Sequence, residues 1–321
     1  MMQSIQQEID ERTNLTSSNK LELLLFRLGN DPLLNRTELF GINVFKVREI
    51  IPMPTVTAVA GSPQHMMGVV DLRGQILPVI DLSAVCGCTP ANGHQILLIT
   101  EYARSTQAFA VESVEDIVRL EWRQVLSAEG NAASGMVTSI ARLDGENSER
   151  LAQVLDVETI LRQVMPSSSL EIDPERIGPK VDLKPGSMIL AADDSLVART
   201  MIEEGLSAMG LPYLMTKTGQ EAWDQLQALA VKAQAEGKDI SDKVALVLTD
   251  LEMPEMDGFT LTRNIKQDPR FAGIPVVIHS SLTGSANEAH VRKVGADAYV
   301  AKFVAEDLAH ALREALHKTV H

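Results

Sequence analysis

Acidic side chains stand directly after two apolar runs in the second half of the chain. Asp193 and Asp194 follow residues 188–192, and Asp250 follows residues 244–249, an almost unbroken apolar run typical of a strand buried on both faces. Open α/β sheets place their ligand crevice at the carboxyl ends of the strands. Three carboxylates gathered there repel one another and favour a bound cation. Mg²⁺ suits them, because it takes oxygen ligands and keeps waters for phosphate oxygens.

Two more polar residues end apolar runs in the same way. Ser280 follows residues 275–279, and Lys302 follows residues 298–301. In a phosphoryl-transfer site Asp250 would attack phosphorus, Lys302 would offset charge on the transferring group, and Ser280 would hydrogen-bond a phosphoryl oxygen. Each residue also has an ordinary explanation, such as a helix cap or a surface charge. The occurrence of all of them at strand ends favours the phosphoryl-transfer site.

The elements that must position these residues alternate between strands and helices. Parallel βα units in a doubly wound sheet are the fold that such alternation predicts. The expected strands are residues 188–192, 213–216, 244–249, 275–279 and 298–301, and the expected helices are residues 195–209, 219–236, a segment starting near 259, and 306–318.

The first half has a different pattern, of short strands separated by turn residues. It predicts an all-β domain, either small barrels or a sandwich, closed by a helix at residues 155–164. No catalytic constellation occurs there. The expected strands are residues 21–28, 38–43, 68–74, 75–82, 95–100 and 107–111.

Composition excludes several classes of function. The chain has 321 residues, 43 acidic and 29 basic side chains, and a net charge of −14, which argues against nucleic acid as the main partner. No apolar run approaches the ~20 residues of a membrane span, and residues 1–10 do not resemble a signal peptide, so we expect a cytoplasmic protein without membrane insertion. Cys86 and Cys88, without a second pair, favour buried thiols over a zinc site.

Four segments organise the chain. Residues 1–20 are a polar arm or short helix, residues 21–165 the β-rich domain, residues 166–186 a linker rich in Pro, Gly and Ser, and residues 187–321 the α/β domain.

Residues 38–50 and 68–82 resemble the CheW family of bacterial chemotaxis adaptors, which bridge chemoreceptors and the histidine kinase CheA. The resemblance implies two small β-barrels packed together. It marks Arg73 as the residue for contact with kinase or receptor, although a solvated turn arginine explains it equally well. Asp71 stands where the family usually has Asn. We interpret Ile76, Leu77, Val79 and Ile80 as core, whereas Val44, Phe45 and Val47 could be core or contact.

Residues 187–321 resemble a CheY-like receiver domain, on the acid pair, the segment from Asp250 to Gly258, and the residues that follow the last two strands. The resemblance implies that Asp250 is the phosphoacceptor and Asp194 a direct Mg²⁺ ligand. Asp193 would act mostly through water, and the Glu252 carbonyl would complete the ligand set. By the same resemblance, Ser280 and Tyr299 form the switch pair.

Three residues depart from the receiver pattern. Phe303 follows Lys302 where proline is usual, so the loop could take a different path. His279 replaces an apolar residue and is interpreted as filling a strand end. Ser280 stands where threonine is commoner. A haloacid-dehalogenase phosphatase also has a strand-end aspartate nucleophile, but it needs a second Asp where this chain has Glu252.

An adaptor joined to a receiver is the arrangement of the CheV-type chemotaxis coupling proteins. The resemblance implies partners in the chemoreceptor array: CheA, the methyl-accepting chemoreceptors, and CheW as a further candidate. Phosphorylation of Asp250 would modulate coupling, and the chain would be no enzyme beyond intrinsic autodephosphorylation. Two alternatives stay open, namely a receiver that acts mainly as a phosphate sink for CheA and a non-phosphorylated docking module.

Overall fold

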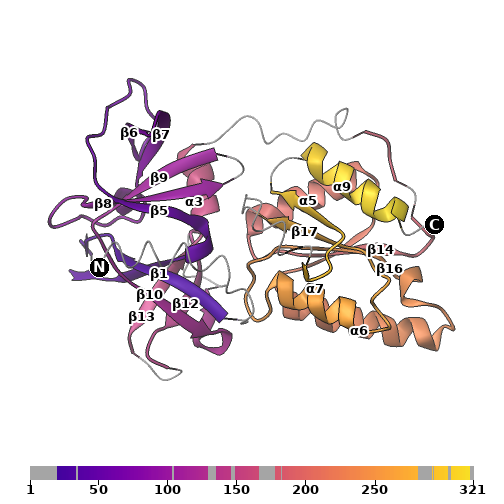
Figure 1. Cartoon of the computed structure of the whole chain (residues 1–321). Helices are drawn as coiled ribbons and strands as arrows, with labels where there is room; N and C mark the ends of the chain where they lie inside the picture. Colours follow the sequence, from indigo (N-terminus) through magenta and orange to yellow (C-terminus); the bar gives the residue numbers. More distant parts are fainter. Residues whose placement is uncertain are drawn as a thin grey trace. The chain divides into compact units, whose positions relative to one another are not determined.

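The chain divides into two compact units, Met1–Ser167 and Ser168–His321, in the computed structural model (Figure 1). Each unit is described by itself below. The structure describes residues 20–33, 35–102, 105–128, 135–145, 149–165, 178–181, 183–280, 291, 293–302 and 305–318. The arm predicted at residues 1–20 therefore lies outside the described residues, except for Lys20.

Two large sheets and the small two-stranded sheet of β2 and β3 make up the described part of the first unit. One large sheet has the strand order β10-β1-β4-β13-β12-β11, and the other has the order β5-β8-β9-β7-β6. Most neighbours are antiparallel, but β4–β13 and β7–β9 are parallel and join distant parts of the chain. The strands are β1 (Lys20–Arg27), β4 (Leu39–Asn43), β5 (Val47–Pro52), β6 (Met66–Leu72), β7 (Gln75–Asp81), β8 (Ile96–Tyr102), β9 (Ser105–Val111), β10 (Ser113–Glu121), β11 (Val125–Ser127), β12 (Val137–Arg142) and β13 (Leu151–Leu155).

Strand β1 explains how its unit is packed. Its side chains alternate between two hydrophobic clusters, so that Leu24 and Phe26 lie in one and Leu23 and Leu25 in the other. All four are fully buried, which accounts for the near-continuous apolar sequence of the strand. Short elements connect the strands: β2 (Asn30–Asp31), β3 (Arg36–Thr37), η1 (Val44–Lys46), α2 (Leu82–Val85) and η2 (Trp122–Gln124).

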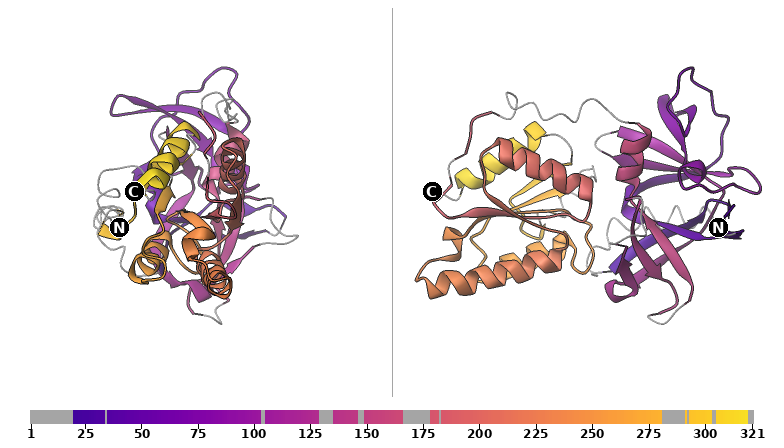
Figure 2. Two further views of the ribbon diagram at one scale, coloured as in Figure 1. Left: turned by 90° about the vertical axis from the view of Figure 1, so that its right-hand side faces the viewer. Right: turned by 180° about the vertical axis from the view of Figure 1, so that it is seen from behind.

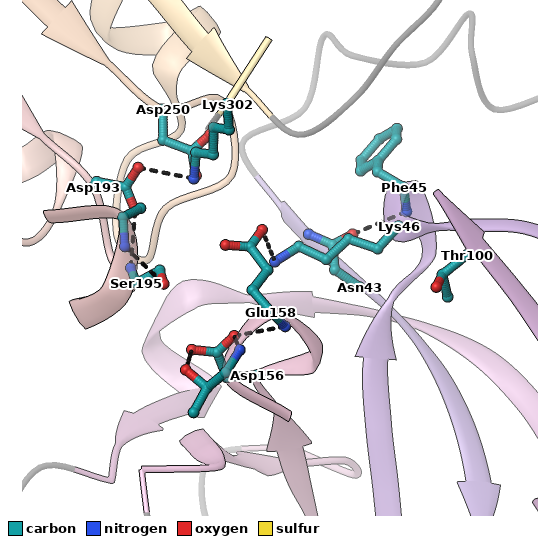
Figure 3. A network of polar contacts seen from close by, with 12 residues as sticks. Asn43, Phe45, Lys46, Thr100, Asp156, Glu158, Asp193, Ser195, Asp250 and Lys302 are labelled. Atoms are coloured by element: carbon teal, nitrogen blue, oxygen red, sulfur yellow. Dashed lines mark hydrogen bonds and ion pairs between the residues drawn. The ribbon is translucent and has the colours of Figure 1, made fainter. Parts of the chain in front are cut away.

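The closing helix of this unit is α3 (Val157–Val164), which begins two residues later than the sequence predicts. Asp156 caps it, because its carboxylate accepts hydrogen bonds from the backbone N–H groups of Glu158 (3.0 Å) and Thr159 (3.1 Å) (Figure 3). The buried Glu158 carboxylate pairs with Lys46 Nζ at 3.3 Å, which ties α3 to η1.

The second unit is a five-stranded parallel sheet with helices on both faces (Figures 1 and 2). Its strand order is β15-β14-β16-β17-β18, the doubly wound order that the sequence resemblance implies. Helices α5 and α9 share one hydrophobic cluster with the sheet, and α6 and α7 share the cluster on the other face. The elements are β14 (Met188–Ala192), α5 (Leu196–Ala208), β15 (Tyr213–Thr216), α6 (Gly219–Ala235), η4 (Ile240–Asp242), β16 (Val244–Thr249), α7 (Gly258–Gln267), β17 (Val276–Ser280), β18 (Ala298–Ala301) and α9 (Ala305–Lys318).

The end of the predicted linker packs on the second unit. Val181 and Leu183 lie against the cluster that α5 and α9 share. The Pro179 carbonyl accepts a hydrogen bond of 2.9 Å from Arg313 of α9. Pro179, Val181 and Leu183, at the end of the predicted linker, are therefore anchored to the second unit.

A close backbone approach fixes the loop that follows β16. Gly258, the first residue of α7, lies so near the Asp250 carbonyl that a Cβ atom added to it would stand 2.0 Å from the carbonyl oxygen. The Gly258 N–H also donates to the Leu251 carbonyl at 2.9 Å. Only glycine allows this approach, and it sets the path of the chain beside Asp250.

We expect Gly258→Ala to destabilise the second unit by about 1–3 kcal/mol, because the new methyl group must push the Asp250 peptide aside. Calorimetric unfolding of the full chain measures the effect. Gly273→Ala is the matched control, since a Cβ there meets nothing within 4 Å. Equal unfolding temperatures for the two variants would contradict this account of the loop.

Candidate functional site

The three predicted acids meet at one edge of the parallel sheet. Asp193 and Asp194 follow β14, and Asp250 follows the neighbouring strand β16. Each residue offers a carboxylate oxygen that lies within 4.8 Å of the others. The strand order reverses between β14 and β16, because the chain first adds β15 on one side and then continues on the other. Ligand crevices of doubly wound sheets lie at such a switch point.

Lys302 joins two of these acids. Its Nζ lies 2.8 Å from Asp193 Oδ2 and 2.8 Å from Asp250 Oδ2 (Figure 3). All three side chains are buried: Lys302 is 1% exposed, Asp193 0% and Asp250 4%. A buried ammonium requires opposite charges at hydrogen-bond distance, so the lysine and the two acids stabilise one another.

In Asp193 and Asp250, a backbone N–H group donates to the carboxylate oxygen that Lys302 does not contact. Asp193 Oδ1 accepts a hydrogen bond of 3.0 Å from the N–H of Ser195, and Asp250 Oδ1 accepts one of 2.7 Å from the N–H of Leu251. Both carboxylates are thus fixed by a backbone N–H on one oxygen and by Lys302 on the other. Their orientation is set before any ligand binds.

The chemistry of this donor set fits a magnesium ion. Three carboxylates and one ammonium leave two negative charges, and the donors are all oxygen atoms, which Mg²⁺ prefers. The residues that would hold it are Asp193, Asp194 and Asp250. The role implied for the Glu252 carbonyl stays a prediction; Glu252 lies in the loop between Asp250 and α7.

Ser280 lies on β17, the neighbour of β16, and Tyr299 lies on β18, one strand further from the acids. Ser280 ends β17, one residue later than predicted, and is 1% exposed; its carbonyl accepts a hydrogen bond of 2.8 Å from the N–H of Lys302. Tyr299 on β18 is half-buried and packs on a cluster that contains Leu251, the neighbour of Asp250. The strand ends therefore bring the two proposed switch residues to the same region as Lys302 and Asp250.

The departures from the receiver pattern have different outcomes. His279 is 3% exposed within β17, in agreement with a histidine that fills a strand end. Phe303 lies outside the described residues.

Sequence reasoning missed two residues that contact the predicted ones. Arg199 of α5 donates to the backbone carbonyls of Asp193 and Asp194. Glu49 of β5 forms an ion pair with Arg73. The position of Arg199, one turn into the helix that follows the acid pair, could have indicated its contact. No local signal could have indicated that of Glu49, because the pair joins strands far apart in sequence.

Arg73 stands at the tip of the β6–β7 hairpin with a positive φ of 54°, a backbone conformation that is uncommon outside glycine. Asp71 Oδ1 accepts a hydrogen bond of 2.7 Å from the Gly74 N–H, so the turn is formed with Asp at this position. The Arg73 side chain is 71% exposed, and that of its partner Glu49 is 17% exposed. The hairpin presents a guanidinium group to solvent from a defined turn.

One prediction near Arg73 is wrong. Ile76 is 61% exposed rather than core, because β6–β7 is the outer hairpin of its sheet and residue 76 points away from the cluster that takes Leu77 and Val79. Leu77, Val79 and Ile80 are buried as predicted. For the three residues left open, Val44 and Val47 are buried and Phe45 is half-buried.

The two cysteines are half-buried rather than buried. Burial raises the pKa of the Cys86 thiol to about 12, and burial also raises the pKa of Cys88. Within the described part of the chain, the only group of acidic, His and Cys side chains close enough to share a metal ion is Asp193, Asp194 and Asp250. Among the same residues, no helix has the length and apolar character needed to cross a membrane.

Two protein families match separate parts of the chain. The CheW-like domain matches residues 22–165, and the response regulator receiver domain matches residues 189–313. The protein is therefore a CheW-like domain joined to a receiver domain, and the receiver match sets aside the haloacid-dehalogenase alternative.

Relatives with both parts also match. Chemotaxis protein CheV3 of Helicobacter pylori is 31% identical over 96% of this chain and 99% of its own length. Chemotaxis protein CheV2 of the same organism is 29% identical over 92% of this chain and 94% of its own. Among solved structures, the scaffolding protein TtCheW from Thermoanaerobacter tengcongensis covers 43% of this chain and 89% of its own, with 20% identity and a TM-score of 0.37. The chain belongs to the CheV family of chemotaxis proteins, as the sequence resemblance predicts.

Lys302→Met tests the balance of charge in the acid cluster. We expect it to lower the stability of the magnesium-free protein by roughly 3–5 kcal/mol, because buried carboxylates lose their ammonium partner. We also expect tighter binding of Mg²⁺, by about tenfold, because a competing cation is gone. Calorimetric unfolding in a chelator and calorimetric titration with Mg²⁺ measure the two effects.

Lys266→Met is the control for this experiment. Lys266 also pairs with a carboxylate, that of Asp297 at 2.8 Å, but near the amino end of β17. Its replacement should leave Mg²⁺ affinity unchanged. Weaker binding of Mg²⁺ by Lys302→Met would show that the lysine supports the cation rather than competing with it.

Proposed function

We propose that this protein couples chemoreceptors to the histidine kinase CheA within a chemoreceptor array, and that phosphorylation of Asp250 modulates the coupling. The observation that carries the proposal is the buried set of Asp193, Asp194, Asp250 and Lys302 at the switch point of the sheet. Its acids can hold a divalent cation, and its lysine can neutralise charge that arrives with a phosphoryl group. The chain is then a phosphoacceptor that turns over no separate substrate.

In the proposed reaction a carboxylate oxygen of Asp250 attacks the phosphorus of a phosphohistidine. The bond from phosphorus to oxygen forms as the bond from phosphorus to nitrogen breaks, and the released imidazole takes a proton from water. Bound Mg²⁺ supplies charge neutralisation at the phosphoryl oxygens. Leu251 N–H and Lys302 hold the Asp250 carboxylate in one orientation, so that little reorganisation is needed at the moment of attack.

The signal would leave the site through Ser280, Lys302 and Tyr299. Phosphorylation adds roughly −1.5 to −2 charges at pH 7. Lys302 would follow this charge, and its N–H is bonded to the Ser280 carbonyl, so the ends of β17 and β18 would respond together. Tyr299, half-buried on β18, is the side chain proposed to change its position with them.

The first unit would supply the contact with the array. Arg73 is exposed on a rigid hairpin, and a planar guanidinium with five donors recognises carboxylates well. Ile76 on the same hairpin adds an exposed apolar side chain. Arginine is one of the residue types enriched among the side chains that contribute most to binding at protein interfaces.

Intact mass measurement tests the phosphoacceptor. With acetyl phosphate and Mg²⁺, the full chain should gain about 80 Da, the mass of a phosphoryl group. Asp250→Asn should gain nothing, and the gain should also vanish in a chelator. An unchanged mass for the wild-type chain would favour the docking-module alternative. In a reconstituted receptor–kinase array without competing receivers, Asp250→Asn should alter kinase activity; under the phosphate-sink alternative it would not.

Arg73→Glu tests the adaptor surface. We expect about tenfold weaker binding to receptor–kinase arrays, because arginine is enriched among the few interface residues whose loss costs more than about 1 kcal/mol. Stability should fall by only about 1 kcal/mol, because Arg73 is 71% exposed even though its partner Glu49 is 17% exposed and loses its counter-charge. Co-sedimentation with arrays measures the binding. The double change Arg73→Glu with Glu49→Arg restores the ion pair without restoring the contact, so recovery of binding would mean that only the internal pair matters.

A further inference from the structure

Arg199 contacts the backbone that carries the acid pair. Its Nη1 donates one hydrogen bond of 3.0 Å to the Asp193 carbonyl and another of 2.7 Å to the Asp194 carbonyl. The side chain starts from the second turn of α5 and reaches back past the Ser195 cap to the end of β14. A single guanidinium nitrogen therefore binds two successive peptide groups in the segment that bears two of the three acids.

We propose that Arg199 is a positioning residue of the metal site: by fixing the peptide groups on both sides of Asp194, it aims the Asp194 carboxylate at the cation. The proposal rests on the proposed function, because it requires that the acid cluster bind Mg²⁺. It adds a residue outside the cluster on which that binding depends.

Asp194 is the acid that lies between the two peptide groups bound by Arg199. Asp193 has its two carboxylate oxygens fixed by the Ser195 N–H and by Lys302. The direction of the Cα–Cβ bond of Asp194, from which its side chain starts, is fixed relative to the two neighbouring peptide groups by φ and ψ. The Asp193 carbonyl belongs to the first of these groups and the Asp194 carbonyl to the second. Arg199 holds both, so it restricts the Cα–Cβ direction of Asp194.

A positioning role and a purely electrostatic role predict effects of opposite sign. The guanidinium group is a permanent positive charge bonded to the backbone of two acids. Coulomb repulsion between this charge and a divalent cation weakens binding, so loss of the charge alone would tighten it. Loss of the hydrogen bonds from Arg199 would instead weaken Mg²⁺ binding, because a less restricted Asp194 carboxylate binds the cation less well. Supports outside a metal's ligand set typically contribute 10–100-fold to affinity.

The test is calorimetric titration of the full chain with Mg²⁺ alone, together with thermal unfolding in a chelator. We expect Arg199→Met, which keeps the length of the side chain without donors or charge, to weaken Mg²⁺ binding about tenfold. Arg199→Lys, whose ammonium can reach both carbonyls, should stay within about threefold of the wild type. Arg270→Met is the control: it removes the same charge from an exposed arginine that pairs with Asp268 and precedes β17, and it should bind Mg²⁺ as the wild type does.

Each outcome decides the proposal. Unchanged or tighter binding by Arg199→Met overturns it, whether or not the unfolding temperature falls, since a fall without loss of affinity is a purely structural effect. If Arg199→Met does not fold, Arg199→Gln carries the same test, because its shorter amide lacks the charge and reaches at most one carbonyl. If the wild-type chain binds no Mg²⁺, the proposed function is wrong. If the wild type and Arg199→Met bind Mg²⁺ equally well, only the role proposed for Arg199 is wrong.

Discussion

Repulsion among three carboxylates at one edge of a sheet is the constraint around which the second unit is arranged. The fold brings Asp193, Asp194 and Asp250 together because β14 and β16 are neighbours that end at the same level. Lys302, from the far strand β18, contributes the cation that makes this arrangement tolerable in the absence of metal. The glycine at position 258 and the backbone N–H groups of Ser195 and Leu251 then fix how the acids are presented. Each of these features matters because like charges at this distance would otherwise separate.

The ion pair at the β6–β7 hairpin and the cluster around Lys302 treat charge in opposite ways. In the first unit, the exposed ion pair of Arg73 and Glu49 contributes little to stability, since solvent screens it. The arginine can therefore exchange its internal partner for an external one at small cost. In the second unit Lys302 is buried between two acids, and removal of any member leaves charge in a poorly solvated place. An exposed ion pair such as that of Arg73 suits the recognition of a partner. A buried cluster of nearly balanced charges, such as that around Lys302, suits a site that must respond to one added phosphoryl group.

The sequence predicts the second unit well because its signals are local. Apolar runs that end in polar residues identify the strands, and those polar residues indicate the candidate site, whose acids the structure places within 4.8 Å of one another. The first unit is less predictable, because β4 pairs with β13 and β7 with β9 across long stretches of chain, and no local pattern reports those neighbours. Ile76 illustrates the limit: an isoleucine in an apolar strand is expected in the core, and only the position of its hairpin at the edge of the sheet exposes it. Arg199 is a different case: its place one turn into the helix after the acid pair makes the contact possible, but its acceptors are backbone carbonyls, so no complementary side chain in the sequence marks it.

The same balance of charge explains why a phosphoryl group at Asp250 could act beyond the site. Lys302 is bonded to Asp193 and Asp250 at equal distances, so neither acid holds it alone. Added negative charge on one side of this arrangement must pull the ammonium group toward it, and the partner acid then depends more strongly on a bound cation. The backbone of Lys302 is bonded to Ser280 and continues from β18, where Tyr299 packs on the cluster that contains Leu251. Under the proposed function, a shift of Lys302 would therefore have a route into the strands that supply these charges, and a site with a single isolated acid would lack this route.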